Sequence, residues 1–314
     1  MAGNGKLDDA ARAAWLYYVA GNTQDQIAAK LGVSRQSAQR LVSLAVSEGL
    51  VKVRIDYPIA RCLDLSRELR ETYALSFCEV VPTDPDSTST TLGVAQATAI
   101  EITNWLRRPD PIVMAVGTGR TLRAAVEQLS TIDCPQHQVV SLTGNISPDG
   151  SAAYYNVVFT MADKVKARFF PMPLPVIASS ESERTALHAQ PMIRNTLALA
   201  AQADVTFVGI GELDDQAPLY LDGFITKEDL QALRDAEAVT EIVGWTYNAE
   251  GRLVEGITNE RVASAPLPDA ESSLVIASAM GPRKLPGIRI ALKGRLVNGL
   301  ITDEATAEAL LNTK

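Results

Sequence analysis

The sequence predicts a two-part α/β protein, in which an N-terminal winged helix-turn-helix domain precedes a larger, doubly wound α/β domain. Three observations support this prediction. Two short amphipathic helical patterns meet at Gly32. From residue 77 onward, apolar runs typical of buried strands alternate with helical patterns. Several of these runs end in glycine-containing turns, which is typical of parallel sheets that bind a ligand.

Length and composition limit the classes of protein to consider. The 314 residues suffice for about two domains, and 46% of them are hydrophobic and 21% charged, as in ordinary globular proteins. The chain has no run apolar enough for a membrane span, and residues 1–18 lack the features of a signal peptide, so we expect a cytoplasmic protein. Three cysteines without a CxxC pair and two histidines argue against disulfides or a zinc site. We expect no metal and no cofactor.

The net charge of −8 is unevenly distributed along the chain. Residues 1–60 hold seven Lys or Arg against five Asp or Glu, whereas residues 61–314 hold 22 against 32. The first part therefore carries +2 and the second −10. An acidic total excludes a protein that coats nucleic acid over its whole surface, but a small basic domain on an acidic body is compatible with DNA binding.

Two helices joined by a tight turn are predicted in the N-terminal part. The first covers residues 24–31, with Thr23 as its N-cap and Gly32 at its C-terminal end, where a positive φ is favoured. The second begins after the cap residue Ser34 and continues an apolar stripe at three- and four-residue steps. An upstream apolar stripe over residues 14–19 provides a supporting first helix. This spacing is typical of a helix-turn-helix.

The exposed face of the second helix is polar and basic. Such side chains hydrogen-bond to base edges and phosphates, so we interpret the face as a DNA-reading surface. A helical hairpin used only for dimerisation is the alternative, and it leaves this face unexplained. The candidate DNA-binding residues are Thr23, Ser34, Arg35, Gln36, Ser37, Gln39, Arg40, Lys52 and Arg54.

The segment 49–55 alternates apolar and basic residues with a period of two. This pattern indicates a short strand or wing, with Lys52 and Arg54 facing the DNA phosphates, and a solvated edge strand is the alternative. A hinge and a connecting helix over residues 61–73 follow. We therefore predict a DNA-binding domain over residues 1–56 and a second domain over residues 57–314.

In the second domain, continuous apolar runs are separated by amphipathic helical patterns. This alternation is typical of a parallel sheet that is covered by helices on both faces. The predicted strands lie at 80–81, 112–116, 139–142, 205–210, 274–279 and 300–301, and the predicted helices at 122–129, 192–203 and 288–296.

Glycine turns follow four of these strands, at 117–121 (GTGRT), 143–145 (TGN), 209–211 (GIG) and 280–281 (MG). In open parallel sheets, ligands bind outside the carboxyl ends of the strands, where glycine turns expose backbone N–H groups and helix N-termini attract anions. The four turns together predict a pocket for a small polar molecule, phosphorylated or not.

Common catalytic and nucleotide-binding motifs are missing from the sequence. It has no GxGxxG with a ribose-binding acid, no GxxxxGK[ST], no GxSxG and no HExxH. A Schiff base on Lys284 or Lys293 is less favoured than a phosphate-pairing or surface role. We therefore expect no enzymatic activity. The alternative is a sugar-phosphate isomerase or deaminase with an attached helical module, whose proton transfer would depend on Glu241, Asp222 or Asp303.

The order of these motifs resembles the SorC family of sugar-binding bacterial transcriptional regulators, which is related to the DeoR and central-glycolytic-regulator proteins. The resemblance extends over nearly the whole chain, from the helix-turn-helix through MAVGTGRTL, VVSLTGNI and DVTFVGIGEL to GPRKLPGIRIALKGRLVNGL. It implies a second domain similar in fold to sugar-phosphate isomerases and glucosamine-phosphate deaminases (NagB/RpiA-like). It also implies effector binding and oligomerisation by that domain.

The resemblance assigns expected roles to residues of the second domain. The GTGRT turn would cradle a phosphate or terminal hydroxyls, Glu241 would contact sugar hydroxyls, and Lys284 would pair with an anionic end. Relatives carry a Gly-Gly pair where this chain has Met280-Gly281, so we expect Met280 to narrow the site. The implied effector-binding residues are Gly117, Thr118, Gly119, Arg120, Thr121, Gly144, Asn145, Glu241 and Lys284.

The combined hypothesis is a DNA-binding transcriptional regulator of a carbohydrate or polyol catabolic operon. Its partners would be operator DNA and a sugar, polyol or sugar-phosphate effector, without contact to a membrane. A single recognition helix reads too few base pairs, so half-site geometry implies a homodimer or homotetramer.

Overall fold

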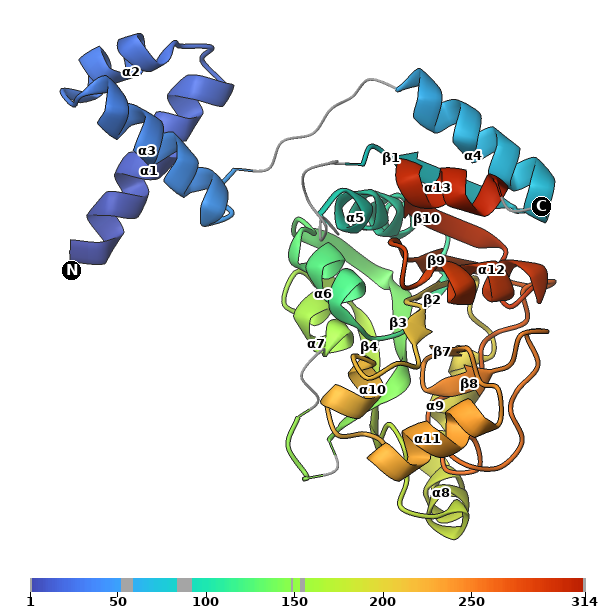
Figure 1. The fold of residues 1–314 in the computed structure, drawn as a ribbon. Coiled ribbons are helices and arrows are strands. Elements are labelled where there is room, and N and C mark those ends of the chain that lie inside the picture. Colours follow the sequence, from blue (N-terminus) through green and yellow to red (C-terminus); the bar gives the residue numbers. More distant parts are fainter. Residues whose placement is uncertain (1, 52–58, 84–91, 148, 153–155, 313–314) are drawn as a thin grey trace. The chain divides into compact units, whose positions relative to one another are not determined.

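The protein, for which we describe a computed structural model, consists of two compact units, Met1–Tyr57 and Pro58–Lys314 (Figure 1). The structure describes residues 2–51, 59–83, 92–147, 149–152 and 156–312. Each unit has a buried hydrophobic core of its own. Within the described ranges, no helix is both long and apolar enough to cross a membrane.

The described part of the N-terminal unit consists of three helices, α1 (Ala2–Tyr18), α2 (Gln24–Leu31) and α3 (Arg35–Ser47). Small and aliphatic side chains form its core: Ala13 from α1, Ile27 from α2, and Ala38 and Val42 from α3. Because alanine side chains are short, α1 and α3 can pack closely, with Ala13 and Ala38 fully buried.

Helices α2 and α3 have the predicted capping groups. The Thr23 hydroxyl accepts a hydrogen bond from the Gln26 N–H at 3.3 Å, and the Gln26 side chain accepts one from the Thr23 N–H at 2.9 Å. Gly32 ends α2 with a φ of 66°, and the Ser34 hydroxyl caps α3 by accepting from the Ser37 N–H at 3.1 Å. The predicted helix-turn-helix is confirmed. Of the predicted wing, residues 52–55 lie outside the described residues.

The C-terminal unit is built on a parallel sheet. Every pair of neighbouring strands runs parallel, which confirms the predicted doubly wound α/β class. Across the described residues, seven strands pair in the order β1 (Phe77–Val81), β10 (Gly299–Asp303), β9 (Leu274–Ser278), β5 (Val205–Val208), β2 (Val113–Val116), β3 (Ile132–Ile146) and β4 (Val165–Pro175).

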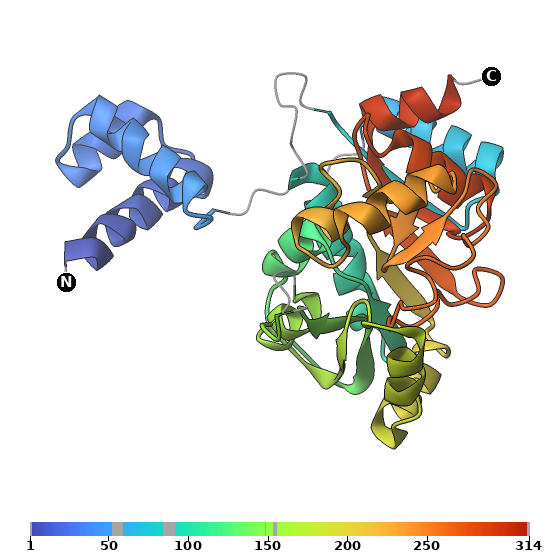
Figure 2. The same ribbon diagram turned by 60° about the horizontal axis from the view of Figure 1, so that its bottom comes forward.

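Helices cover both faces of this sheet (Figures 1 and 2). Successive side chains of β2 point to opposite faces of the sheet. Met114 and Val116 pack into the core on one face, and Ala115 packs into the core on the other. The first core contains side chains of α5 (Leu92–Leu106), α6 (Arg120–Glu127) and α7 (Val157–Ala162); the second contains those of α4 (Ala60–Tyr73), α9 (Pro191–Ala200), α12 (Leu285–Lys293) and α13 (Glu304–Leu311).

The beginning and the end of the C-terminal unit are held together. Helices α4 and α13 lie side by side in both ribbon views (Figures 1 and 2). The Tyr73 hydroxyl donates a hydrogen bond to the Leu310 carbonyl at 3.1 Å, and Arg61 forms an ion pair with Glu308 at 2.8 Å. The connecting helix is thus part of the α/β unit.

A smaller antiparallel sheet and additional helices are inserted between β5 and β9. The turn of its hairpin consists of Val243 and Gly244, with φ values of 50° and 89°. Two consecutive positive φ angles are typical of a two-residue hairpin turn, and a β-branched residue in this conformation is uncommon. The inserted elements are β6 (Gly211–Glu212), α10 (Pro218–Leu221), α11 (Lys227–Asp235), β7 (Thr240–Ile242) and β8 (Trp245–Tyr247), and α8 (Glu181–His188) lies just before α9.

Two strands of the parallel sheet differ clearly from the prediction, and the antiparallel strands β6, β7 and β8 were not predicted either. The strand predicted at 139–142 is the centre of the much longer β3, which continues through the TGN segment instead of ending before it. Strand β4 was not predicted, because Pro171, Pro173 and Pro175 interrupt the usual signal of a strand. At the edge of a sheet, where β4 lies, prolines are tolerated because no neighbour needs their N–H groups.

Candidate functional site

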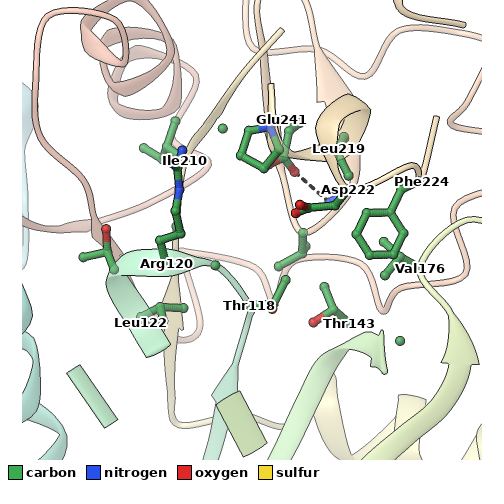
Figure 3. A pocket seen from close by; sticks show the side chains of 18 of the residues that line it. Thr118, Arg120, Leu122, Thr143, Val176, Ile210, Leu219, Asp222, Phe224 and Glu241 are labelled. Atoms are coloured by element: carbon green, nitrogen blue, oxygen red, sulfur yellow. Dashed lines mark hydrogen bonds between the residues drawn. The ribbon is translucent and has the colours of Figure 1, made fainter. Parts of the chain in front are cut away.

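A pocket with a volume of about 390 Å³ opens at the carboxyl ends of β2, β3 and β5 (Figure 3). Strands β2 and β5 are neighbours, but the chain continues from β2 toward β3 and β4 and from β5 toward β9 and β10 on the opposite side. Ligands of doubly wound sheets bind at such a reversal of strand order. The pocket is lined by Thr118, Gly119, Arg120, Thr121, Leu122, Thr143, Gly144, Val176, Gly209, Ile210, Gly211, Pro218, Leu219, Asp222, Phe224, Glu241, Val243, Gly244 and Lys284.

Seven of the nine residues expected at the effector site line this pocket, whereas Gly117 and Asn145 do not. Gly117 lies behind the wall, where its N–H donates to the Phe207 carbonyl at 2.8 Å and a Cβ atom would come within 3.0 Å of Val243. Asn145 lies within β3 because that strand continues to Ile146. The family resemblance implied a contact by Asn145, and the TGN segment was expected to form a turn beside the pocket.

The GTGRT segment brings the N-terminus of α6 to the pocket. Gly119 is the N-cap residue, with a φ of 122°, and no side chain caps the helix. Because the cap residue is a glycine, it has no side chain that could accept from the first N–H groups of α6, and Arg120 and Thr121 of this first turn line the pocket wall. Such a helix start attracts hydroxyl oxygens and anions.

Glu241 projects from β7 into the pocket (Figure 3). Its Oε2 accepts a hydrogen bond from the Gly244 N–H at 2.8 Å. Burial raises the pKa of Glu241 and the charge of Glu212 raises it further, whereas the Gly244 bond and the charge of Lys284 lower it. Gly211 pairs with Glu241 across the small sheet, and a Cβ atom on Gly211 would overlap the Glu241 carboxylate.

Lys284 lies at the start of α12, on the wall of the pocket. Burial lowers the pKa of Lys284, since the charged form loses solvation. The charges of Glu212 and Glu241 oppose this effect, while Arg120 and Arg283 add to it. The ammonium group of Lys284 is thus influenced by both carboxylates and guanidinium groups.

A segment that sequence reasoning did not assign to the site covers one side of the pocket. Pro218, Leu219 and Phe224 supply apolar surface from α10 and the loop after it, and Asp222 adds a carboxylate. Burial raises the pKa of Asp222, and the charge of Arg120 lowers it. The apolar side chains carry no motif, so nothing in the sequence marked them as lining residues.

Met280 does not narrow the pocket. It packs against the core on the α5–α7 face of the sheet and is not among the described lining residues. The residue that lines the pocket in this part of the chain is Lys284, four residues after Met280. The expectation that Met280 shapes the site was therefore wrong.

The polar face of α3 is exposed in the N-terminal unit. Arg35, Gln36, Gln39 and Arg40 are solvent-exposed, and the ion pair of Arg35 with Asp25 at 3.5 Å is open to solvent. Such a pair contributes little stability and leaves the guanidinium accessible. Thr23 and Ser34 are exposed cap residues, Ser37 is half-buried, and Lys52 and Arg54 lie outside the described residues.

Comparison with known proteins identifies both units. Residues 57–312 match the Sugar-bind family, described as "Putative sugar-binding domain", and residues 6–54 match a homeodomain-like domain family. The chain belongs to the SorC family of sugar-binding transcriptional regulators. A similar solved structure is that of the full-length sorbitol operon regulator SorC from Klebsiella pneumoniae, with a TM-score of 0.72, 25% identity, and coverage of 98% of this chain and 99% of that chain.

Two relatives of this SorC-family regulator match over almost their whole lengths. The erythritol catabolism regulatory protein EryD of Brucella abortus is 34% identical over 96% of each chain. The transcriptional regulator LsrR of Klebsiella pneumoniae is 30% identical over 96% of this chain and 92% of its own. Both relatives are named as regulators, in agreement with the exposed recognition face of α3.

Of the acids on which the alternative enzyme would depend, Glu241 and Asp222 line the pocket of this SorC-family regulator and Asp303 does not. His137 is fully buried, with its Nδ1 accepting from the Ile112 N–H at 3.3 Å, and His188 contacts the Ala263 carbonyl at 2.9 Å. Asp303 caps α13 by accepting from the Thr306 N–H at 3.1 Å. Of the candidate acids, only Glu241 and Asp222 reach the pocket, and no histidine joins them there in the described part of the chain.

Proposed function

We propose that this SorC-family regulator controls a carbohydrate or polyol catabolic operon by binding operator DNA through α3 and a sugar, polyol or sugar phosphate in the pocket. The observation that carries the proposal is the pocket at the β2–β5 reversal, where Arg120, Glu241 and Lys284 converge on a space of about 390 Å³. A carboxylate accepts from hydroxyl groups and a cation binds oxygen acceptors, which suits a polyhydroxylated ligand.

The names of two relatives support a small carbohydrate as the effector. One is named for erythritol catabolism and the other, a solved structure, for the sorbitol operon. We propose that the effector of this chain belongs to the same broad chemical class, with Thr118, Thr121, Glu241 and Lys284 as contacts to its oxygen atoms. The pocket residues of this chain serve binding alone, and we propose no catalytic reaction.

Operator recognition requires more than one copy of the chain. Helix α3 has 13 residues and a length of about 20 Å, enough for a single half-site in the major groove. We propose a homodimer or homotetramer that places two copies of α3 on a pseudo-palindromic operator. The effector changes DNA affinity to the extent that it binds two arrangements of this oligomer with different affinities.

A gel-shift experiment with the region upstream of its own operon tests the DNA-binding part of the proposal. We expect wild type to retard this fragment and the double variant Arg35→Ala, Arg40→Ala to lose most of that affinity, because both guanidinium groups face outward on α3. The double variant Arg67→Ala, Arg252→Ala removes the same charge from the C-terminal unit and is the control. Equal retardation by wild type and the α3 variant would contradict the proposal.

A further inference from the structure

The charged side chains of the pocket wall have no net positive charge. Arg120 and Lys284 contribute two cations, while Asp222 and Glu241 contribute two carboxylates. A site for a phosphate ester carries a surplus of cations or N–H donors, because the ester brings a charge of about −1.5 to −2 at neutral pH. The charged side chains of this wall give no such surplus, and the N–H groups at the start of α6 are its remaining donors to an anion.

Glu212 is a further carboxylate, located immediately behind the wall. It follows the lining residue Gly211 in β6, is 8% exposed and does not itself line the pocket. Its Oε1 is 3.4 Å from Arg283, but that guanidinium already donates to both carboxylate oxygens of Asp214 at 2.6 and 2.7 Å. The Oε2 of Glu212 has no hydrogen-bond partner among the described residues. A buried carboxylate with so few hydrogen bonds and ion pairs has strong electrostatic interactions with nearby charges, because little solvent screens it.

The charges of Glu212 and Glu241 both oppose the lowering of the pKa of Lys284 by burial. In the described part of the chain its ammonium group makes no hydrogen bond or ion pair, and Glu241 binds Gly244 through Oε2 alone. A ligand hydroxyl satisfies both groups, because it accepts from the ammonium and donates to the carboxylate. A phosphate oxygen only accepts, and its charge would be repelled by Glu241 and by Glu212 behind it.

We infer that the effector is an uncharged polyol or sugar rather than its phosphate ester, and that Glu212 is the residue that sets this preference. This inference rests on the proposed function, because it concerns the ligand of the same pocket. Glu212 acts through Lys284 and is a positioning residue without contact to the ligand. It neutralises the cation that would otherwise draw a phosphate into the site.

Isothermal titration calorimetry on the full-length protein tests the preference with matched pairs of ligands. The pairs are erythritol, xylitol, D-sorbitol and D-ribose, each with its terminal phosphate ester. For any pair of which one member binds, we expect the parent compound to bind about tenfold more tightly than its phosphate ester. The carboxylates in and behind the pocket wall repel the charge of the ester. An ester that binds as tightly as its parent, or more tightly, would overturn the inference and leave the proposed function intact. Failure of all eight compounds to bind would instead overturn the proposed effector class.

The substitution Glu212→Gln tests the role of Glu212 itself. It keeps the shape of the side chain, and its lost charge should reduce the preference for the parent compound over the ester by about tenfold. Asp215→Asn is the matched control, because Asp215 lies three residues along the chain, pairs with Arg234 and is 80% exposed. An unchanged preference in Glu212→Gln, or an equal change in Asp215→Asn, would show that Glu212 does not set it. The wild-type comparison stands even if the Glu212 variant does not fold.

Discussion

Glu241 is held in the pocket at a cost to stability. Burial raises its pKa, so the folded protein binds a proton at this site more readily than the unfolded chain does. In the unfolded chain the pKa of Glu241 is about 4.3, and in the folded protein it is higher. By linkage, the free energy of unfolding of the ligand-free protein therefore falls as the pH rises from the first of these pKa values through the second. A binding residue that weakens the empty protein is a common compromise between function and stability.

Replacing Glu241 tests this relation. We expect Glu241→Gln to raise the free energy of unfolding at pH 7 by about 0.5–2 kcal/mol and to have no such effect below about pH 3, where the carboxyl is neutral in both states. The same variant should lose the stabilisation by effector, because the carboxylate no longer accepts from its hydroxyls. Urea unfolding at the two pH values, with and without effector, measures both effects. A variant that is less stable at pH 7, or that keeps its effector response, would argue against this role.

The two glycines of the GIG turn offer a matched comparison. A Cβ atom at Gly211 would overlap the Glu241 carboxylate, whereas one at Gly209 would meet only the Thr118 carbonyl at 3.5 Å, an ordinary contact. The Glu241 side chain can move, so Gly211→Ala should displace it from Gly244 and weaken effector binding by about tenfold, the loss of one charge-assisted hydrogen bond. Gly209→Ala leaves Glu241 in place, and although Gly209 also lines the pocket, its affinity for the effector should fall less than that of Gly211→Ala. Calorimetry measures both, and equal affinities for the two variants would contradict the assignment.

At the scale of elements, the N-cap of the recognition helix combines stability and function. The Ser34 hydroxyl accepts from the Ser37 N–H at 3.1 Å, so Ser34→Ala should destabilise α3 by about 1 kcal/mol. Ser43→Ala, an exposed change within the same helix, is the control and should be neutral or slightly stabilising. Hydrogen exchange of the α3 amides in the full-length protein measures the difference. Equal protection in both variants would mean that the cap contributes nothing.

The elements predicted well from sequence are those with local signals. The caps Thr23 and Ser34 and the positive φ of Gly32 depend on neighbouring residues only, and they mark α2 and α3 correctly. The buried strands were found because parallel strands covered on both faces are continuously apolar. Strand β4 was missed, because its prolines contradict local propensity and are accepted only at the sheet edge.

The parts of the pocket that escaped prediction depend on tertiary packing. Leu219 and Phe224 line the pocket because α10 and the following loop lie over it, and an apolar side chain alone gives no sign of such a place. The TGN segment was predicted as a turn, but β3 continues through it with register shifts around Gly144; Gly144 lines the pocket and Asn145 does not. Close contacts such as Gly211 against Glu241 arise only when two distant strands pair.

At the scale of the whole molecule, the separate cores of the two units predict separate functions. The fragment Pro58–Lys314 contains the complete set of pocket residues and both sheet-face cores. We expect it to fold alone, to bind effector within about threefold of the full-length affinity, and to lose operator binding, since independent units contribute additively. Calorimetry and gel shift on this fragment measure the two properties. Loss of effector binding in a folded fragment would show that the N-terminal unit contributes to the pocket.

The central claim is that effector occupancy of the pocket changes the affinity of α3 for operator DNA. Fluorescence anisotropy of a labelled operator, titrated with full-length protein with and without a saturating effector, measures this coupling directly. We predict a change in operator affinity of about 5- to 150-fold in wild type, the usual range of allosteric coupling, and none in Glu241→Gln, which should still bind DNA. An operator affinity that no carbohydrate ligand of the pocket alters would contradict the account.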